Sequence, residues 1–245
     1  MKNLNLRFFY SLLAICVVIT LSSFQKNNES PNTLTQKEKN AGWSLLFDGK
    51  STNGWHLYNK KAGPTAWGIK NGELFCNPEN KNEAERGDLL TDKEYENYEL
   101  KFEWKISEGG NSGVFINVIE KKDVPTAWAS GPEYQLLENT HADYAKPKSR
   151  AGCLYNFSAV KNPVEPKAAG QWNQSVIKQK NGKIEFYLNG VLTATEDFKS
   201  QGWKDKINET WFKSFPEFGK YTKGHIALQD WNKGISFRNI KIRQL

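Results

Sequence analysis

Short runs of alternating apolar and polar residues, separated by tight turns, fill the chain from Trp43 to its C-terminal end. The clearest run is Tyr98-Glu-Leu-Lys-Phe-Glu-Trp-Lys-Ile106, in which every second side chain is apolar. Because successive side chains of a strand point to opposite faces, this run predicts a strand with one buried face. Asn-Gly pairs at 71–72, 181–182 and 189–190 predict tight hairpin turns between such runs.

Runs of this kind recur along the chain and predict its strands. They cover residues 43–47, 67–75, 98–106, 113–119, 133–138, 152–155, 174–180, 183–188, 191–194, 224–229 and 235–242. A helical turn is expected only near residues 203–212, and no repeat has the period of a propeller or a solenoid. Short strands at this spacing, joined by hairpins, predict an all-β sandwich.

The chain begins with the pattern of a secretory signal peptide, which we place at residues 1–23. Lys2 and Arg7 precede an apolar run over 8–21, and small residues follow it. This run is too short and too simply flanked to favour a permanent membrane span. We therefore expect an exported protein, either periplasmic or at the cell surface or secreted. It would contact a membrane only through an uncleaved signal segment.

Residues 24–41 are rich in Asn, Ser, Lys and Glu, and this composition predicts a flexible linker. Residues 42–245 are then expected to form one domain, since a mature chain of about 220 residues can bury a single all-β core. The formal net charge of +7 comes from Lys and Arg that are scattered among Asp and Glu. Without a basic stripe or a nucleic-acid motif, we expect no nucleic-acid partner.

Cys76 and Cys153 are the only cysteines after the apolar N-terminal run. Two cysteines are too few for a disulfide framework, and neither has the spacing of a metal site. Both lie in apolar, strand-like runs, which predicts buried free thiols. A single disulfide between them stays open.

The stretch Gly131-Pro-Glu-Tyr-Gln-Leu-Leu-Glu138 carries the residues best suited to catalysis. In a strand, Glu133 and Gln135 share one face, and their apolar neighbours share the other. Glu138 would return to the face of Glu133 only if a β-bulge accommodated one extra residue. Two carboxylates on one face suit general acid–base chemistry on sugars. The alternative is a pair of solvated carboxylates on the polar face of an antiparallel strand.

Three long segments flank this strand and its neighbour, at 120–132, 139–150 and 156–171. Segments of this length in a compact domain are usually functional, so we expect a binding cleft there. The chain also contains nine Trp and nine Tyr residues. Aromatic faces bind sugars, although aromatic residues also suit pleated sheets.

Several motifs follow one another in a definite order along residues 43–245. They are Leu46-Phe-Asp-Gly-Lys-Ser51, Trp67-Gly-Ile-Lys-Asn-Gly-Glu-Leu-Phe75, Gly110-Asn-Ser-Gly-Val-Phe115, Glu133-Tyr-Gln135, Ala151-Gly-Cys-Leu-Tyr155, Gly170-Gln-Trp-Asn173, His225-Ile-Ala-Leu-Gln-Asp230 and Phe237-Arg-Asn-Ile-Lys-Ile242. In this order they resemble the 3-keto-disaccharide hydrolase domain family, also called 3-keto-glucoside lyase/hydratase. The resemblance implies a concanavalin-like jelly roll of two antiparallel sheets with the ligand on the concave face. Glu133 and Gln135 are expected on that face.

A more distant resemblance is to the laminarinase-type glycoside hydrolases. Their catalytic strand carries Glu-x-Asp-x-x-Glu with a bulge, and the same layout here holds Glu133, Gln135 and Glu138. An amide cannot tune its neighbours as the central Asp does, so Gln135 argues against ordinary retaining hydrolysis. Trp231 stands where members of the 3-keto-disaccharide hydrolase family often have His.

The resemblance implies chemistry that begins at a ketone on C3 of the sugar. The ketone acidifies the C2 proton, a base removes it, the C1 substituent leaves, and water adds to the product. Such a site needs a base, an acid and a hydrogen-bonding group at the enolate oxygen. We expect Glu133 to be the base, with Glu138 second. His141 and Tyr155 are the expected proton donors.

Further residues are expected to bind the substrate or a metal ion. Asn111 and Gln135 would hold sugar hydroxyls or the carbonyl, and Trp128 in a long loop would stack on the ring. Gln229 and Asp230 end a strand, where they either bind substrate or cap it. The sequence requires no cofactor. If a divalent metal binds, Glu138 and His141 are the expected ligands, although the chain has no His-x-x-x-His motif and no Asp-rich loop.

Three functions therefore stay open. The first is a secreted enzyme that cleaves 3-keto-glycosides, the second a non-catalytic carbohydrate-binding module, and the third an ordinary glycoside hydrolase. A pure binder needs aromatic and amide groups rather than two acids on one face, and Gln135 argues against the third function.

Overall fold

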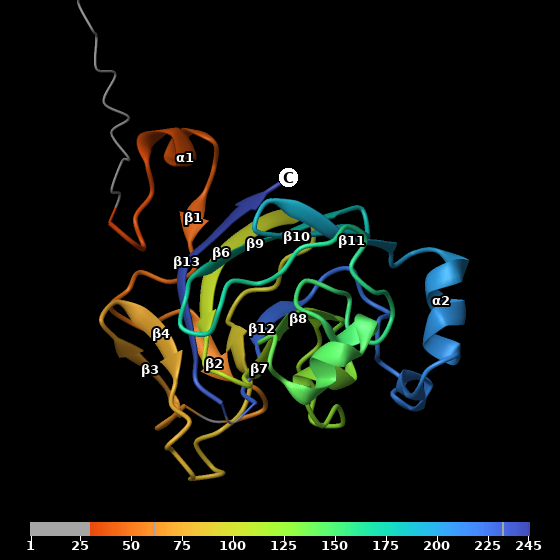
Figure 1. Ribbon diagram of the computed structural model, residues 1–245, viewed down its shortest axis with the longest axis horizontal. Coiled ribbons are helices and arrows are strands. Elements are labelled where there is room, and N and C mark those ends of the chain that lie inside the picture. Colours follow the sequence, from red (N-terminus) through yellow and green to blue (C-terminus); the bar gives the residue numbers. More distant parts are fainter. Residues whose placement is uncertain (1–29, 61, 232) are drawn as a thin grey trace, which may run out of the picture.

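The computed structural model describes residues 30–60, 62–231 and 233–245. Two antiparallel β-sheets pack against each other (Figure 1). Side chains from both sheets form one large hydrophobic core. The all-β sandwich predicted from the sequence is thereby confirmed. The signal peptide predicted at 1–23 lies outside the described residues.

The larger sheet is built from eight strands. They are β1 (Ser44–Leu45), β3 (Trp67–Lys70), β4 (Glu73–Cys76), β6 (Tyr98–Ile106), β9 (Asn173–Lys180), β10 (Lys183–Leu188), β11 (Val191–Asp197) and β13 (Ile235–Gln244). Seven of them lie in the order β11-β10-β9-β6-β13-β4-β3, and β1 pairs with β13.

The smaller sheet has five strands. They are β2 (Trp55–Leu57), β5 (Leu89–Thr91), β7 (Asn111–Val118), β8 (Glu133–Leu137) and β12 (His225–Leu228). They lie in the order β2-β5-β12-β7-β8, so neighbours in space come from distant parts of the chain.

In the described ranges, two α-helices and four short 3₁₀ helices accompany the strands. They are α1 (Gln36–Asn40), α2 (Gln201–Asn208), and 3₁₀ helices at Ala127–Ala129, Ala142–Ala145, Pro147–Ser149 and Trp211–Ser214. The helical turn expected near 203–212 is thus present, and α2 stands at the side of the sandwich away from α1 (Figure 1). Within the described ranges, each helix is too short or too polar to cross a membrane.

The Asn-Gly hairpins form where the sequence predicts them. Asn71, Asn181 and Asn189 have φ angles of 54°, 53° and 48°, and the Gly after each also has a positive φ. Positive φ at both loop positions is the type I′ turn, whose twist matches that of the flanking strands. The turns close the β3–β4, β9–β10 and β10–β11 hairpins, with Lys70 opposite Glu73 in the first.

The alternation of β6 places its apolar residues in the core, as predicted. Its buried inward-facing residues are Tyr98, Leu100, Phe102, Trp104 and Ile106. Because β6 pairs with both β9 and β13, it is a central strand of the larger sheet.

Tyr134 of β8 reaches across the core to the larger sheet. Its hydroxyl lies 2.8 Å from the Ser175 hydroxyl of β9 and donates to the carbonyl of Tyr187 in β10 at 3.0 Å. Trp104 Nε1 of β6 donates to the same Ser175 hydroxyl at 2.9 Å. Buried phenol and indole groups need such partners, and these hydrogen bonds fix β8 against the larger sheet.

The structure differs from the predicted strands in two places. Strands β2 and β5 were not expected, because each has only three residues, too few for a pattern to be recognised. Conversely, the segment expected as a strand at 152–155 makes isolated bridges, from Leu154 to Tyr134 and to Ser158. That segment nevertheless lies along the free edge of β8, where the amide of Tyr155 donates to the carbonyl of Glu133 at 3.0 Å.

The described part of the linker predicted at 24–41 is folded rather than free. It contains α1, which begins with a reciprocal capping box. Glu38 of α1 forms an ion pair with Lys241 of β13 at 2.8 Å. The amide of Asn32 donates to Asn239 Oδ1 at 2.6 Å, and the amide of Asn239 donates back to Asn32 Oδ1 at 2.8 Å. These contacts hold the segment on the edge of the larger sheet.

Cys76 and Cys153 are buried and unpaired, as predicted. Burial raises the pKa of both thiols, so the reactive thiolate is disfavoured in the native protein. We expect a thiol reagent to label neither cysteine in native protein that lacks residues 1–23. After denaturation without reductant, both should react. Recovery of no thiol after denaturation would show a disulfide and contradict the structure.

Candidate active site

The candidate site lies on the face of the five-stranded sheet that points away from the core. On β8, Tyr134 and Leu136 belong to the core, so Glu133 and Gln135 point outwards as predicted. Gln135 lies opposite Gly113 of β7. The polar residues of β8 therefore lie on the outer face of the sheet, outside the hydrophobic core.

The same outer face continues on β12 and β5. Leu228 of β12 pairs with Leu89 of β5, and both side chains belong to the core. Gln229 directly follows β12 and Asp88 directly precedes β5, so alternation turns both side chains to the outer face. The amide of Gln229 donates to the carbonyl of Gly113 at 2.9 Å, which places Gln229 beside β7.

A first cavity of about 260 Å³, here called cavity A, opens on this face. Its polar lining includes Asn111, Glu133, Gln135 and Gln229, and its aromatic lining consists of Trp128, Tyr155, Trp211, Phe212 and Trp231. Cavity A thus brings together six residues expected at the site: Asn111, Trp128, Glu133, Gln135, Tyr155 and Gln229. The sequence analysis did not propose Trp211, Phe212 or Trp231 as ligand-binding residues.

A second cavity of about 340 Å³, here called cavity B, adjoins the first. Trp128, Gln229 and Trp231 line both cavities. Asp88 and Lys60 line cavity B only, and they make its lining more polar than that of cavity A. The sequence analysis did not identify Asp88.

Glu133 is packed tightly into the outer face of the sheet. A Cβ atom placed on Gly113 would lie 2.0 Å from Glu133 Oε1, so the glycine leaves the space that the carboxyl group fills. Burial, together with the negative charge of Asp88, raises the pKa of Glu133 well above its usual value. The carboxyl group is therefore protonated over a wider pH range than a solvated glutamate.

Gln135 and Asn111 form one polar unit next to Glu133. Gln135 Nε2 donates to Asn111 Oδ1 at 2.9 Å. Tyr155 lies near the same carboxyl group, and burial, followed by the charge of Glu133, raises the pKa of its hydroxyl. Its phenol therefore stays protonated and can donate a hydrogen bond.

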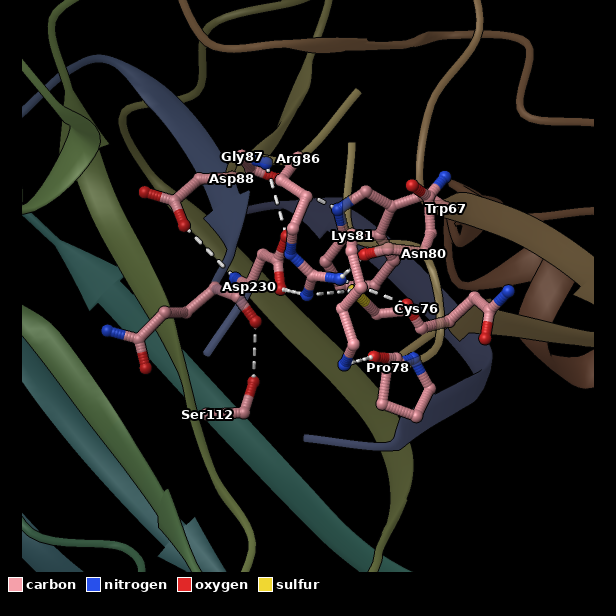
Figure 2. Close-up of polar contacts among 12 residues, drawn as sticks. Trp67, Cys76, Pro78, Asn80, Lys81, Arg86, Gly87, Asp88, Ser112 and Asp230 are labelled. Carbon is pink, nitrogen blue, oxygen red and sulfur yellow. Dashed lines mark hydrogen bonds and ion pairs between the residues drawn. The ribbon is translucent and has the colours of Figure 1, made fainter. Parts of the chain in front are cut away.

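Asp88 is held at the other side of the site by a buried network (Figure 2). The amide of Asp230 donates to Asp88 Oδ1 at 3.1 Å. Burial raises the pKa of Asp88 to about 7; the charge of Asp230 adds to this effect, and its amide opposes it. A carboxyl group with this pKa can take or give a proton near neutral pH.

Arg86 and Asp230 form the ion pair at the centre of this network, and both side chains are buried. Arg86 also donates to the carbonyls of Asn77 at 3.0 Å and Asn80 at 2.7 Å, and the amide of Gly87 donates to Asp230 Oδ2 at 3.1 Å. Asp230, expected to bind substrate or cap the strand, is thus engaged by the protein, although it also lines cavity B.

Glu138 does not reach the face of Glu133. The pairing of β7 with β8 runs without a shift from Phe115–Glu133 to Asn111–Leu137, so the bulge expected there is absent. The Glu138 carboxylate accepts from the amides of Gly109 and Thr140, each at 2.9 Å, and from the Thr140 hydroxyl. Burial works to raise its pKa, but these hydrogen bonds hold the pKa below its usual value.

His141 has a local structural role as well. It caps the 3₁₀ helix at Ala142–Ala145, and its Nδ1 accepts from the amide of Asp143 at 3.0 Å. Of the two residues expected to bind any metal, Glu138 uses Oε2 and His141 uses Nδ1 in such local bonds. Among the residues that the structure describes, no three His, Cys, Asp or Glu side chains are grouped so that they could hold a metal ion.

Two of the three long segments expected at the cleft contribute to it. Trp128 comes from 120–132, and Asp143 and Ser149 come from 139–150. The segment 156–171 instead lies along the larger sheet, where the amide of Lys161 donates to the carbonyl of Thr193 at 2.6 Å. The 3₁₀ helix at Trp211–Ser214 takes its place and supplies Trp211 and Phe212.

The contact between Gly113 and Glu133 predicts a specific stability effect. The added methyl group of Gly113→Ala must displace the Glu133 carboxyl group, and such overpacking costs about 1–3 kcal/mol. Gly68→Ala is the matched control, because a Cβ on Gly68 of β3 would meet no atom within 4 Å. Urea unfolding should show a lower free energy of unfolding for Gly113→Ala and no loss for Gly68→Ala.

A double-mutant cycle makes this test specific to the pair. In a Glu133→Ala background the clash is gone, so Gly113→Ala should cost much less there than in the wild type. Equal costs in both backgrounds would show that Gly113 is required for a reason unrelated to Glu133.

The raised pKa of Glu133 predicts how stability depends on pH. A group whose pKa is raised by folding contributes stability below its unfolded pKa, and this stability is lost as the pH rises through the folded pKa. The wild type should therefore lose stability relative to Glu133→Gln as the pH rises from about 4.5. Urea unfolding at a series of pH values measures this difference.

Glu138→Gln provides the opposite sign as a control. Since folding lowers the pKa of Glu138, the wild type should be more stable than Glu138→Gln at neutral pH, and the gap should close as the pH falls. A Glu133→Gln profile with the same slope as that of Glu138→Gln would contradict the burial of an uncharged Glu133.

Comparison with known proteins identifies the family. A family model described as the 3-keto-alpha-glucoside-1,2-lyase-like domain matches residues 42–243. A curated 3-keto-disaccharide hydrolase of Bacteroides thetaiotaomicron is 30% identical over 229 residues, which cover 83% of this chain and 79% of the relative.

Solved structures agree with this assignment. A glycosyl hydrolase candidate from Parabacteroides distasonis matches with a TM-score of 0.79 at 30% identity, over 88% of this chain and 99% of its own. A second candidate from the same organism has a TM-score of 0.62 at 27% identity, over 83% and 99% of the two chains. The chain therefore belongs to the 3-keto-alpha-glucoside-1,2-lyase-like family and is a carbohydrate-active, hydrolase-like jelly roll.

Proposed function

We propose that this protein is an exported enzyme that cleaves 3-keto-glycosides. In the proposed reaction, Glu133 removes the C2 proton of the keto sugar, the C1 substituent is eliminated, and water adds to the resulting double bond. The name of the curated relative from Bacteroides thetaiotaomicron supports the substrate class. The signal-peptide pattern at residues 1–23 supports export.

The observation that carries this proposal is the buried Glu133 carboxyl group in an aromatic-lined cavity. A carboxylate with a raised pKa is a stronger base than a solvated one, and removal of a proton from carbon needs a strong base. Groups with a strongly raised pKa are often found at functional sites. Cavity A provides space for a ligand beside Glu133.

Hydrogen-bond donors beside Glu133 suit an enolate. When the C2 proton leaves, negative charge develops on the oxygen of the C3 ketone, and donors fixed in place stabilise that charge. The linked amides of Gln135 and Asn111 and the hydroxyl of Tyr155 line the same cavity as Glu133. They are the groups that we propose to hold the ketone.

The aromatic lining supports a sugar as the ligand. Trp128 is fixed by edge-to-face packing, with ring centroids 5.3 Å from Trp211 and 4.7 Å from Phe215. Trp211 and Trp231 remain 49% and 52% exposed at the cavity, which is unusual for such large apolar groups. Exposed indole faces beside polar groups are suited to stacking against a sugar ring.

We expect Glu133→Gln to lower the rate of 3-keto-glucoside cleavage at least a hundredfold, because proton transfer by a positioned base contributes about 10²–10⁴-fold. Product analysis by mass spectrometry measures the rate. Glu79→Gln, which changes an exposed glutamate far from β8 in sequence, is the matched control. A rate within threefold of the wild type for Glu133→Gln would remove this residue from the mechanism.

The substrate comparison tests the reaction type. Wild-type protein should cleave the 3-keto-glucoside far faster than the unoxidised parent, because only the ketone makes the C2 proton acidic. In D₂O the product should carry deuterium at C2. Equal rates for both substrates would indicate ordinary glycoside hydrolysis, and binding without cleavage of either would indicate a carbohydrate-binding module.

A further inference from the structure

We propose that cavity B holds the leaving group of the glycoside and that Asp88 is the catalytic acid that protonates it. This inference rests on the proposed function, in which Glu133 acts on the keto sugar in cavity A. It assigns a role to a residue and to a cavity that the proton abstraction by itself leaves unused.

The two cavities adjoin, so one glycoside can occupy both, with the keto sugar in cavity A and the leaving group in cavity B. Glu133 lines cavity A, Asp88 lines cavity B, and Gln229 lines both. A glycoside that spans the cavities would place its C1–O bond near Gln229. The base is then on the side of the keto sugar and Asp88 on the side of the departing oxygen.

Gln229 itself indicates that a ligand belongs at this junction. The residue is only 8% exposed, and among the described residues its buried Oε1 has no hydrogen-bond partner. A buried amide oxygen without a partner is unfavourable, and the great majority of such groups in proteins are satisfied. A sugar hydroxyl at the junction would supply the missing donor.

The surrounding network leaves Asp88 able to carry a proton. Arg86, the nearest buried cation in sequence, is paired with Asp230, and Figure 2 shows the Asp88 carboxyl group turned away from its guanidinium. The amide of Asp230 fixes one oxygen of Asp88 at 3.1 Å. Burial brings its pKa to about 7, so Asp88 can give a proton near neutral pH in the form of the protein in which Glu133 is ionised.

The elimination step balances with these two carboxyl groups. Glu133 takes the C2 proton, and the electron pair of that bond forms the enolate of the C3 ketone. The ketone then re-forms as the C1–C2 double bond forms and the C1–O bond breaks. The leaving oxygen keeps the electron pair of the broken bond and takes the proton of Asp88.

The hydration step returns both groups to their starting states. Asp88, now ionised, takes a proton from water as the water oxygen bonds to C1. The proton on Glu133 exchanges with solvent, and Glu133 then protonates C2. No oxidant or reductant is consumed, and the net reaction is hydrolysis.

The lining of cavity B favours a leaving group that carries hydroxyls. Thr126 contributes a hydroxyl that makes no capping bond to its own helix. Lys60 also lines the cavity, but its Nζ already donates to the carbonyls of Glu83, Ala84 and Arg86. The Thr126 hydroxyl and the Asp88 carboxyl group suit a second sugar ring better than an apolar alcohol.

The test compares two substrates that share the 3-keto-glucosyl group. In a 3-keto-disaccharide the leaving alkoxide needs a proton, whereas p-nitrophenol leaves as a stable anion. Asp88→Asn should therefore slow cleavage of the disaccharide at least a hundredfold but slow the p-nitrophenyl glycoside less than about tenfold. Glu133→Gln should slow both substrates at least a hundredfold. Asp205→Asn, on exposed α2, is the control for the substitution itself.

A second variant tests cavity B without changing either carboxyl group. Thr126 has extended backbone angles that suit an aromatic residue, so Thr126→Trp should fill the cavity without strain. We expect it to lower kcat/KM for the 3-keto-disaccharide at least tenfold more than for methyl 3-keto-glucoside. Equal losses for both would place the leaving group elsewhere.

The outcomes separate this inference from the proposed function. Wild-type protein that cleaves neither 3-keto substrate would overturn both. Active wild type with equal losses for both leaving groups in Asp88→Asn would overturn the acid role alone. A loss in Glu133→Gln that is selective for the 3-keto-disaccharide, together with equal losses for both substrates in Asp88→Asn, would show that the two roles are reversed. Circular dichroism confirms that each variant is folded.

Discussion

Burial on both faces of the five-stranded sheet is the constraint on which the site depends. One face of β8 fills the core through Tyr134 and Leu136, and the other carries Glu133 beneath loops rather than in open water. A carboxyl group in such a place loses solvation, which favours its neutral form. Two solvated carboxylates on a polar strand face, the simplest interpretation of the sequence, do not describe this protein. The chemistry proposed for Glu133 follows from its position between packed layers.

The ion pair of Arg86 and Asp230 supports the part of the site that lies at the ends of β5 and β12. Breaking a buried pair by removal of one partner typically costs about 3–5 kcal/mol, because the remaining charge is left buried. The pair joins the segment before β5 to the end of β12, and these two positions carry Asp88 and Gln229. Asp230 is thus best understood as a support for the site, since its carboxylate is already engaged by Arg86 and by the amide of Gly87.

Local patterns were enough to predict the hairpins, β6 and the outward direction of Glu133, because period-two alternation depends only on neighbouring residues. Asp88 could not be found this way. It precedes a three-residue strand whose partners come from distant parts of the chain, and its local signal, an acid after a glycine, is also typical of a turn. The prediction that Glu138 shares the face of Glu133 was wrong for a related reason. A bulge depends on how β8 pairs with β7, and that pairing is continuous. Trp211 gave no positional signal either, because only the tertiary fold brings its helix to cavity A.

The hydrogen bonds of Tyr134 give the larger sheet an influence on a reaction that it does not touch. Tyr134 lies between Glu133 and Gln135 in the chain, so the position of its hydroxyl against Ser175 sets the depth of both neighbours. A substitution in β9 that lengthened this link would shift the carboxyl group that we propose as the base without altering any residue of either cavity. Selection for stability in the sandwich and selection for turnover on its outer face are therefore not independent. In directed evolution of this enzyme, beneficial changes should arise on the far sheet as well as around the ligand.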